Sequence, residues 1–294
     1  MPSPDPTPFD DSGDSTADTE LRDEVYLQLA QFLGPGGPYE NPRYNFDTDV
    51  INAVARLYLD SQADVARGGA MAVVTAGPPG AGKSTSVEHV EDLDTYRRVD
   101  ADEIKDLLLE LLAKAGELDF LAAVSLVDGR PIMRRELAGW VHGASTSVWN
   151  RVVRASMRRR ENIVIEGTLK YRPLAQEYDT ALRRFRYDSL HIIDVEVDET
   201  LAIESARQRW WNRRCTDPLG GRFMLDEWVH EAFLDATHSK CAVTADELWD
   251  RTWQDFDVVH ERVTRNGDHE TTALRRQSRK GFVVGDIFPP ADPS

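Results

Sequence analysis

One eight-residue stretch constrains this chain more than any other feature. Residues 77–84 read Gly-Pro-Pro-Gly-Ala-Gly-Lys-Ser and match the pattern G-x-x-x-x-G-K-[ST] of a phosphate-binding loop. The apolar residues 71–76 predict a buried strand before the loop, and residues 84–93 predict a helix after it. This is the context that a phosphate loop (P-loop) requires, whereas the alternative, an ordinary Gly-Pro turn that happens to contain Lys-Ser, does not need it.

The chemistry of such a loop follows from its backbone. Its N–H groups and the start of the following helix present partial positive charge to phosphates. Lys83 is expected to reach the β- and γ-phosphates and the Ser84 hydroxyl to hold Mg²⁺. The motif therefore predicts ATP and Mg²⁺ as cofactors, bound by Gly77, Pro78, Pro79, Gly80, Ala81, Gly82, Lys83, Ser84 and Thr85.

The rest of the chain alternates short apolar segments with helical spacing. Short strands between helices predict an α/β fold, a P-loop NTPase or kinase fold with a mostly parallel central sheet flanked by helices. The further predicted strands are 96–99, 162–165, 190–197 and 257–263. The predicted helices are 21–33, 47–68, 102–115, 133–160, one that follows residue 172, 199–214 and 226–236.

Composition divides the chain into a body and two ends. The first twenty residues hold six acidic residues, four prolines and no Lys or Arg, so we expect a disordered acidic tail over 1–20. A helix and a Gly/Pro linker are expected over 21–40, the P-loop domain over 41–270 and a C-terminal extension over 271–294.

Charge and cysteine content exclude several classes of protein. With 35 Lys and Arg against 51 Asp and Glu the net charge is −16, which argues against nucleic acid as a partner. Cys215 and Cys241 form neither a disulfide framework nor a metal spacing, as expected in a reducing compartment. No apolar run approaches the ~20 residues that span a bilayer. We therefore expect a soluble cytoplasmic protein with no membrane partner.

Two acids follow the strand predicted at 96–99. Asp100 and Asp102 lie at the carboxyl edge of the sheet, where parallel α/β folds bind ligands, and their alternate spacing points both side chains the same way in an extended chain. One could position Mg²⁺-bound water while the other accepts a proton from a substrate hydroxyl. The alternative is that either acid only caps the following helix.

Another acid ends the strand predicted at 162–165. Glu166 and Thr168 also lie at the carboxyl edge near the P-loop, and an acid buried there is unfavourable unless it is paired, which favours a ligand-facing role. The alternative is a simple Glu-Gly turn.

A basic, glycine-containing tract follows the helix predicted at 199–214. Glycines beside Arg222 are typical of a small lid that closes over ATP, and Arg209 and Arg222 could deliver guanidinium groups to the migrating phosphoryl group. The alternative is that these arginines are surface cations near a helix C-terminus.

Taken together, the motifs resemble the zeta-toxin family of P-loop kinases, and the tracts around Arg209 and Arg222 are similar to an actinobacterial-type branch. The resemblance covers about residues 47–266 and includes the P-loop, the Asp-x-Asp pair, a helix that opens near His142 and Ser145, and the strand end at Glu166.

The resemblance implies an enzyme that uses ATP and Mg²⁺ to phosphorylate a sugar hydroxyl of UDP-N-acetylglucosamine or a related nucleotide sugar. It also implies a possible protein antitoxin. Asp102 would be the base, and Lys83, Arg209 and Arg222 would act on the phosphates. The implied substrate-binding residues are Asp100, Ser145, Asn150, Glu166, Thr168 and Lys170.

The sequence departs from the family at several of these positions. Lys170 replaces a frequent Arg, and Asn150 stands where the family often has Glu. A different acceptor, such as a dinucleotide or an antibiotic hydroxyl, therefore stays open. So does a nucleotide-operated switch or binding module that transfers nothing to a small molecule.

Overall fold

The structure, a computed structural model, describes residues 15–42, 44–62, 65–266, 269–278 and 281–283. The first helix, α1 (Ser15–Leu33), begins inside the segment predicted to be a disordered tail, so residues 15–20 are helical instead. The rest of that predicted tail, residues 1–14, lies outside the described residues.

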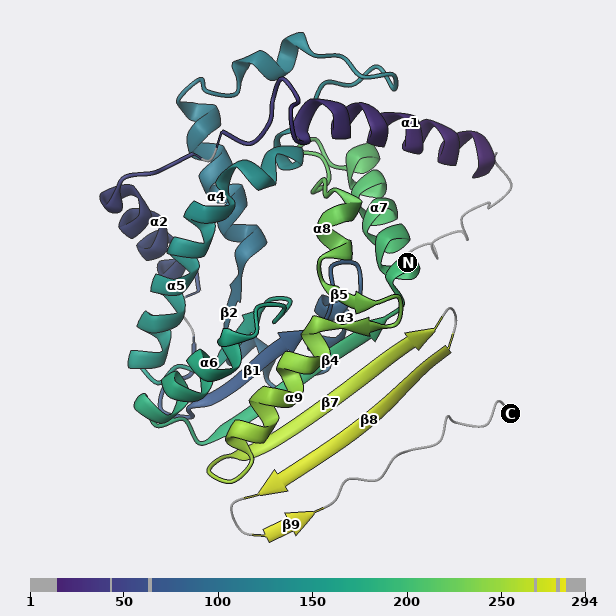
Figure 1. The fold of residues 1–294 in the computed structure, drawn as a ribbon. Helices are drawn as coiled ribbons and strands as arrows, with labels where there is room; N and C mark the ends of the chain where they lie inside the picture. The colour runs from purple at the N-terminus through teal and green to yellow at the C-terminus, as the bar shows by residue number, and fades with distance from the viewer. Residues whose placement is uncertain (1–14, 43, 63–64, 267–268, 279–280, 284–294) are drawn as a thin grey trace, which may run out of the picture.

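A seven-stranded sheet forms the centre of the described structure, in the order β2-β3-β1-β4-β7-β8-β9 (Figure 1). The first five strands in that order are parallel, β8 pairs antiparallel with β7, and β9 pairs antiparallel with β8, which confirms the predicted mostly parallel sheet. The strands are β1 (Met71–Ala76), β2 (Arg97–Asp100), β3 (Ile163–Glu166), β4 (Ser189–Val197), β7 (Asp257–Asn266), β8 (His269–Ser278) and β9 (Gly281–Val283).

Helices cover the sheet, and hydrophobic clusters lie on both of its faces. Alternate residues of β1 divide between them, with Val74 in one cluster and Val73 in the other, as the two-residue period of a strand requires. The remaining helices are α2 (Thr48–Asp60), α3 (Lys83–Val87), α4 (Ala101–Lys114), α5 (His142–Arg158), α6 (Pro173–Arg184), α7 (Glu199–Thr216), α8 (Asp226–His230) and α9 (Lys240–Thr252), with 3₁₀ turns at Leu93–Thr95, Asp119–Ala123 and Arg134–Val141. No helix in the described ranges is both long and apolar enough to cross a bilayer.

Four predicted helices differ from the structure. The helix predicted over 47–68 ends at Asp60. The helix predicted over 84–93 ends at Val87, and that over 133–160 is a 3₁₀ turn followed by α5. The helix predicted over 226–236 ends at His230, and a short hairpin of β5 (Phe233–Asp235) and β6 (His238–Ser239) follows. The Asp235 carboxylate causes this turn, because it accepts hydrogen bonds from the backbone N–H groups of Thr237 and His238, both at 3.0 Å.

The outer edge of β2 is closed by a side chain rather than by another strand. The Gln62 amide donates to the Arg98 carbonyl at 3.1 Å and accepts from the Arg98 N–H at 3.0 Å, as a neighbouring strand would. The Tyr58 hydroxyl accepts from the N–H of Asp100 at 3.1 Å. These bonds satisfy the edge of the strand that carries Asp100.

Candidate active site

The P-loop connects β1 to α3 and depends on its glycines. Gly77, Gly80 and Gly82 have φ angles of 133°, 85° and 82°, a region that residues with a Cβ rarely adopt. A Cβ on Gly77 would also meet the carbonyl oxygen of Val195, and one on Gly80 would meet that of Ala202. The loop therefore packs its backbone directly against β4 and α7, and its conformation requires glycine.

Lys83, the first residue of α3, folds back over this loop. Its ammonium donates to the carbonyl oxygens of Gly77 at 2.9 Å and Pro78 at 2.8 Å. Burial lowers the pKa of Lys83 to about 8, because the charged ammonium has lost water. Phosphate oxygens would supply stronger partners than these carbonyls.

Ser84 and Glu166 form a second part of the site. The Ser84 hydroxyl lies 3.5 Å from Glu166 Oε2, while Arg98 donates to Oε1 of the same carboxylate at 2.6 and 2.9 Å. Arg98 thus pairs one oxygen of Glu166 and leaves the other toward the P-loop. A hydroxyl and a carboxylate oxygen are ligands that Mg²⁺ prefers, so this pair fits a Mg²⁺–nucleotide.

Asp100 begins α4 as its N-cap. Its carboxylate accepts a hydrogen bond from the N–H of Asp102 at 2.7 Å, so the capping alternative describes this residue correctly. Asp100 is also the register partner of Glu166 on the neighbouring strand. Burial, and then the nearby charge of Asp102, raises the pKa of Asp100 to about 6.

Asp102 lies one residue inside α4, among cations. Lys105 Nζ is 3.0 Å from Oδ1, and Arg222 Nε is 3.4 Å from Oδ2. Burial alone would raise the pKa of Asp102, but the charges of Lys105, Arg222 and Arg209 outweigh it and lower the pKa. Asp102 is therefore a carboxylate at neutral pH and can accept a proton once a hydroxyl displaces Lys105 from it.

The two predicted arginines approach from the other side of the site. Arg222 follows the loop after α7, donates to the Asp102 carbonyl at 2.8 Å and pairs with Asp106 at 3.1 Å. Arg209 is exposed on α7 and forms no ion pair within the described part of the chain. Burial lowers the pKa of Lys83 most, and the charge of Arg209 lowers it further. The same charge helps to lower the pKa of Asp102, together with Lys105 and Arg222.

The loop that was predicted to be a lid is anchored in this structure. Asp106 accepts from Arg135 at 3.0 Å as well as from Arg222, and Arg135 in turn pairs with Asp217 at 2.5 Å. The N–H of Arg135 also donates to the carbonyl of Leu219 at 2.9 Å. These contacts tie the loop to α4 in an arrangement that places Arg222 over Asp102.

The other predicted substrate residues divide into two groups. The Thr168 carbonyl accepts from the N–H of Gly77 at 3.0 Å, and Lys170 pairs with Glu231 at 3.2 Å, so both border the P-loop or α8. Ser145 is buried and donates to the carbonyl of His142 at 2.8 Å. Asn150 is exposed more than one turn further along α5. The role of these two α5 residues in substrate binding stays a prediction.

Three residues at the site were not singled out from the sequence. Lys105 could have been found, because a lysine three residues after Asp102 on a helix lies on the same face. Nothing in the sequence around Arg98 or Arg265 indicated that either residue lies at the site. Arg265, on β7, donates to the carbonyl of Ala81 at 2.6 Å, and a Cβ on Gly82 would meet this guanidinium.

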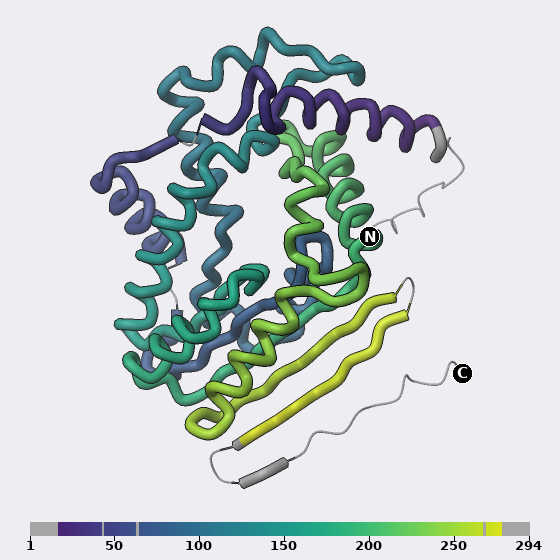
Figure 2. Tube along the Cα trace, in the orientation of Figure 1, coloured from purple at the N-terminus to yellow at the C-terminus, as the bar shows by residue number. Residues whose placement is uncertain are grey.

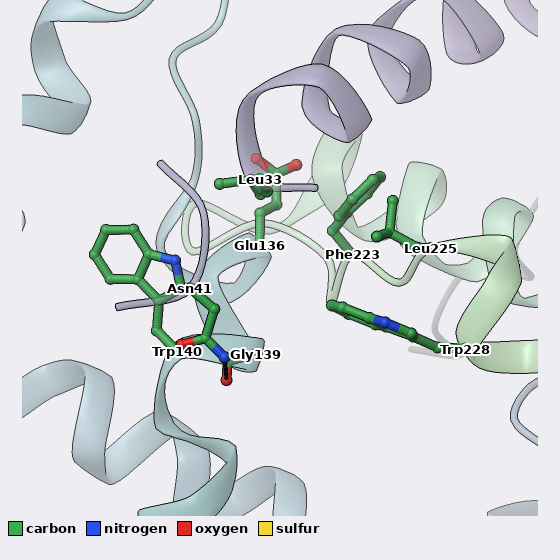
Figure 3. Close-up of a pocket in the computed structure, with 8 residues that line it drawn as sticks. All are labelled: Leu33, Asn41, Glu136, Gly139, Trp140, Phe223, Leu225 and Trp228. Carbon is green, nitrogen blue, oxygen red and sulfur yellow. Dashed lines mark hydrogen bonds between the residues drawn. The ribbon is translucent and has the colours of Figure 1, made fainter. Parts of the chain in front are cut away.

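A small apolar pocket lies next to the residues that follow Arg222 in the chain. Trp140, Gly139 and Asn41 line one side of it and Phe223, Leu225 and Trp228 the other (Figure 3). Its free volume of about 20 Å³ has room for one water molecule. The pocket is therefore a gap in the packing behind Arg222, and the ligand-binding geometry belongs to the P-loop edge.

A family model described as an AAA domain matches residues 73–219, half of the chain. The chain belongs to this AAA-domain family. The matched span contains the P-loop, both acids of the Asp-x-Asp pair, Glu166 and Arg209, and it ends three residues before Arg222. No curated protein sequence matches the chain.

Two solved structures share the fold of this AAA-domain chain. One was reported for the PezAT chromosomal toxin-antitoxin system of the human pathogen Streptococcus pneumoniae, with 14% identity, a TM-score of 0.51, and coverage of 77% of this chain and 81% of that chain. The other is AvrRxo1-ORF1:AvrRxo1-ORF2 with sulphate ions, with 14% identity, a TM-score of 0.55, and coverage of 85% and 74%. At this identity the likeness shows the fold alone.

Proposed function

We propose that this chain is a phosphotransferase that moves the γ-phosphate of ATP to a hydroxyl of a small molecule. The observation that carries the proposal is the position of Asp102. This charged carboxylate lies beside Arg222 and within electrostatic influence of Lys83, the P-loop lysine. A carboxylate held by cations that a bound hydroxyl can displace suits transfer to an acceptor.

The proposed reaction uses the groups already described. Asp102 accepts the proton of the acceptor hydroxyl, whose oxygen bonds to the γ-phosphorus while the bond to the β-phosphate oxygen breaks and ADP leaves. Lys83 and the loop N–H groups bind the phosphates. Arg209 and Arg222 stabilise the negative charge on the transferred group.

Ser84 and Glu166 would hold Mg²⁺ against the nucleotide. When bound, this ion neutralises charge on the β- and γ-phosphates. Arg98 keeps the Glu166 carboxylate oriented toward Ser84 through its two hydrogen bonds to the other oxygen. Magnesium usually binds through one or two carboxylates plus phosphates, and this donor set is of that kind.

For the acceptor, we propose a sugar hydroxyl of UDP-N-acetylglucosamine or a related nucleotide sugar. The order of the motifs supports this proposal, as does the fold shared with the structure from the PezAT toxin-antitoxin system. The same likeness supports a protein antitoxin as a partner. Thr168 and Lys170, which border the P-loop and α8, are the residues that we expect to contact the acceptor, along with Asp100 and Glu166.

Mass spectrometry of the reaction products tests the proposal. The full chain is incubated with ATP, Mg²⁺ and a panel of nucleotide sugars, dinucleotides and hydroxylated antibiotics, with a Lys83→Ala variant beside it. We expect a gain of ~80 Da, one phosphoryl group, on a nucleotide sugar with the wild-type chain only. A gain on another compound would keep the transferase and change the acceptor. ATP turnover with no gain on any compound would contradict the transferase.

A further inference from the structure

Two segments carry the predicted arginines: α7, which carries Arg209, and the residues after it that include Arg222. Tyr26 of α1 lies where these two arginine-bearing segments meet. Its ring is 6.1 Å from the ring of Trp210 and 5.2 Å from that of Phe223. Trp210 follows Arg209 in the chain, and Phe223 follows Arg222. One buried side chain from a distant helix therefore touches the immediate neighbour of each arginine.

The Tyr26 hydroxyl adds two directional bonds to this packing. It donates to Asp226 Oδ1 at 2.9 Å and accepts from the N–H of Asp226 at 2.9 Å. The Asp226 carboxylate is also bound by Arg207 of α7, whose guanidinium lies 4.1 Å from the centre of the Tyr26 ring. The hydroxyl, Asp226 and Arg207 form one network that joins α7 to the segment after Arg222.

The two arginine-bearing segments also approach each other closely. A Cβ on Gly221 would run into the carbonyl oxygen of Trp210, so the backbones are in contact next to Arg222. The pocket described above adjoins this contact through Phe223. Packing beside Phe223 is thus incomplete, and the bonds of Asp226 add a directional restraint on this segment.

Further contacts hold the first half of α1 against the middle of α7, and the two helices are next to each other in Figures 1 and 2. Arg22 pairs with Glu204 at 2.5 Å and donates to Gln208 at 2.9 Å, and Trp211 donates to Asp18 at 3.0 Å. Because these contacts do not involve Tyr26, loss of its hydroxyl leaves α1 docked. The hydroxyl can therefore be tested apart from the helix that carries it.

We propose that Tyr26 is a positioning residue that sets the spacing of Arg209 and Arg222 through Asp226 and Arg207. The inference rests on the proposed phosphotransferase function, in which both guanidinium groups must reach the same phosphoryl group. A small change in the position of a catalytic group is enough to reduce turnover greatly.

The experiment compares Tyr26→Phe with Tyr187→Phe in the full chain. Tyr187 is also buried, and its hydroxyl donates to the carbonyl of Glu161 at 2.7 Å, near the starts of β3 and β4 and away from the carboxyl edge. We expect Tyr26→Phe to lower kcat about tenfold with KM for ATP within twofold, and Tyr187→Phe to leave both unchanged. Tyr26→Phe loses two hydrogen bonds and Tyr187→Phe loses one, so Tm should fall in both variants and further in Tyr26→Phe.

A second readout does not depend on turnover. ADP with Mg²⁺ and aluminium fluoride mimics the transferred phosphoryl group, and we expect the wild-type chain to bind this combination more tightly than ADP with Mg²⁺ alone. In Tyr26→Phe, the ratio of these two affinities should be about tenfold smaller than in the wild type, while the affinity for ADP with Mg²⁺ should be unchanged. An increment equal to that of the wild type would overturn the positioning role and leave the proposed function intact.

Absence of any increment in the wild-type chain, with no transfer to any acceptor, would instead overturn the proposed function and the role of Tyr26 with it. If Tyr26→Phe does not fold, Asp226→Asn removes the charge that binds Arg207 and keeps the shape. The same tenfold losses are then expected, and wild-type values in a folded Asp226→Asn chain would contradict the inference.

Discussion

The two sides of the candidate site are built in different ways. The P-loop side is contiguous, because eight consecutive residues, from the end of β1 into the start of α3, supply the glycine turns, the lysine and the serine. The arginine side is assembled from distant segments, since Tyr26 reaches Asp226 and Asp18 reaches Trp211 across about 200 residues of sequence. A local motif can specify a rigid phosphate cradle, whereas the arginine geometry depends on tertiary contacts.

The two sides of the site should also respond differently to mutation. Backbone contacts hold the P-loop, and a Cβ at Gly77 or Gly80 would meet main-chain oxygens. Side-chain ion pairs, such as that of Arg135 with Asp217, hold the arginine side. Conservative substitutions should therefore leave the first side intact and disturb the second.

The largest effect is expected on the P-loop side, from Lys83→Ala. Removing the ammonium takes away a charge aimed at the β- and γ-phosphates, and we expect kcat/KM to fall about 10³-fold. Phosphoryl transfer is measured by product mass with saturating acceptor. Lys114→Ala, an exposed lysine at the end of α4, serves as the control and should behave as wild type. Transfer that survives in Lys83→Ala would remove the P-loop from the reaction.

On the arginine side, Arg222→Lys keeps the charge but loses the planar fork of donors. We expect kcat to fall about 10²-fold while the affinity for ATP changes less than twofold. Single-turnover kinetics and nucleotide titration separate the two quantities. Arg213→Lys, at an exposed position in the last turn of α7, controls for charge at the helix end. If ATP affinity and kcat fell equally, Arg222 would belong with the ground-state contacts of the P-loop side.

The lowered pKa of Lys83 predicts a pH dependence confined to the P-loop side. Phosphates bind the charged ammonium. Nucleotide affinity should therefore be highest below the pKa of about 8 that Lys83 has without nucleotide, and should fall as the pH rises above it. We expect about a tenfold loss per pH unit from pH 8 until the pKa of the complex is reached. Titration with a fluorescent ATP analogue measures it. A slope that persists in Lys83→Ala would assign the titration to another group.

The smallest effect concerns Asp100, which lies at the carboxyl edge opposite the arginines. Folding raises its pKa to about 6, so its protonated form is favoured in the folded state, and its contribution to stability is present below the unfolded pKa and lost as pH rises through 6. Asp100→Asn should therefore raise the free energy of unfolding by about 1 kcal/mol at pH 7 and leave it unchanged below pH 4. Asparagine can still cap α4.

Denaturant melts at several pH values check this prediction. Asp94→Asn, an exposed acid in the turn before β2, is the control and should change little at any pH. A wild-type chain that is more stable than Asp100→Asn at pH 7 would mean that the capping bond of the carboxylate outweighs its burial.

The sequence predicted the site where the chemistry is local and failed where it is not. The P-loop and the acids at the ends of β2 and β3 follow from motif and strand pattern, and the structure places them along one edge. The hairpin after α8 was missed because Asp235 turns the chain through side-chain bonds that helical periodicity does not register. The helix α9, capped by Ser239, was not predicted.

The long-range partners had no signal at all. Nothing near Arg265 in the sequence relates it to Ala81, and nothing near Tyr26 relates it to Asp226. Such pairs arise from the order of the strands and the docking of α1, which periodicity alone does not give. Ser145 was named from the resemblance alone; it lies on the buried face of α5, and its role in substrate binding stays a prediction.

The bond between Arg265 and the P-loop has a consequence for the order of synthesis. The guanidinium that braces the Ala81 carbonyl is made 184 residues after the loop itself, which at ~5–20 residues per second is roughly 10–40 s later on the ribosome. A growing chain thus carries the whole nucleotide motif long before it can hold that motif in its final shape. Arg265 must therefore be synthesised before the P-loop can be held in the shape described here.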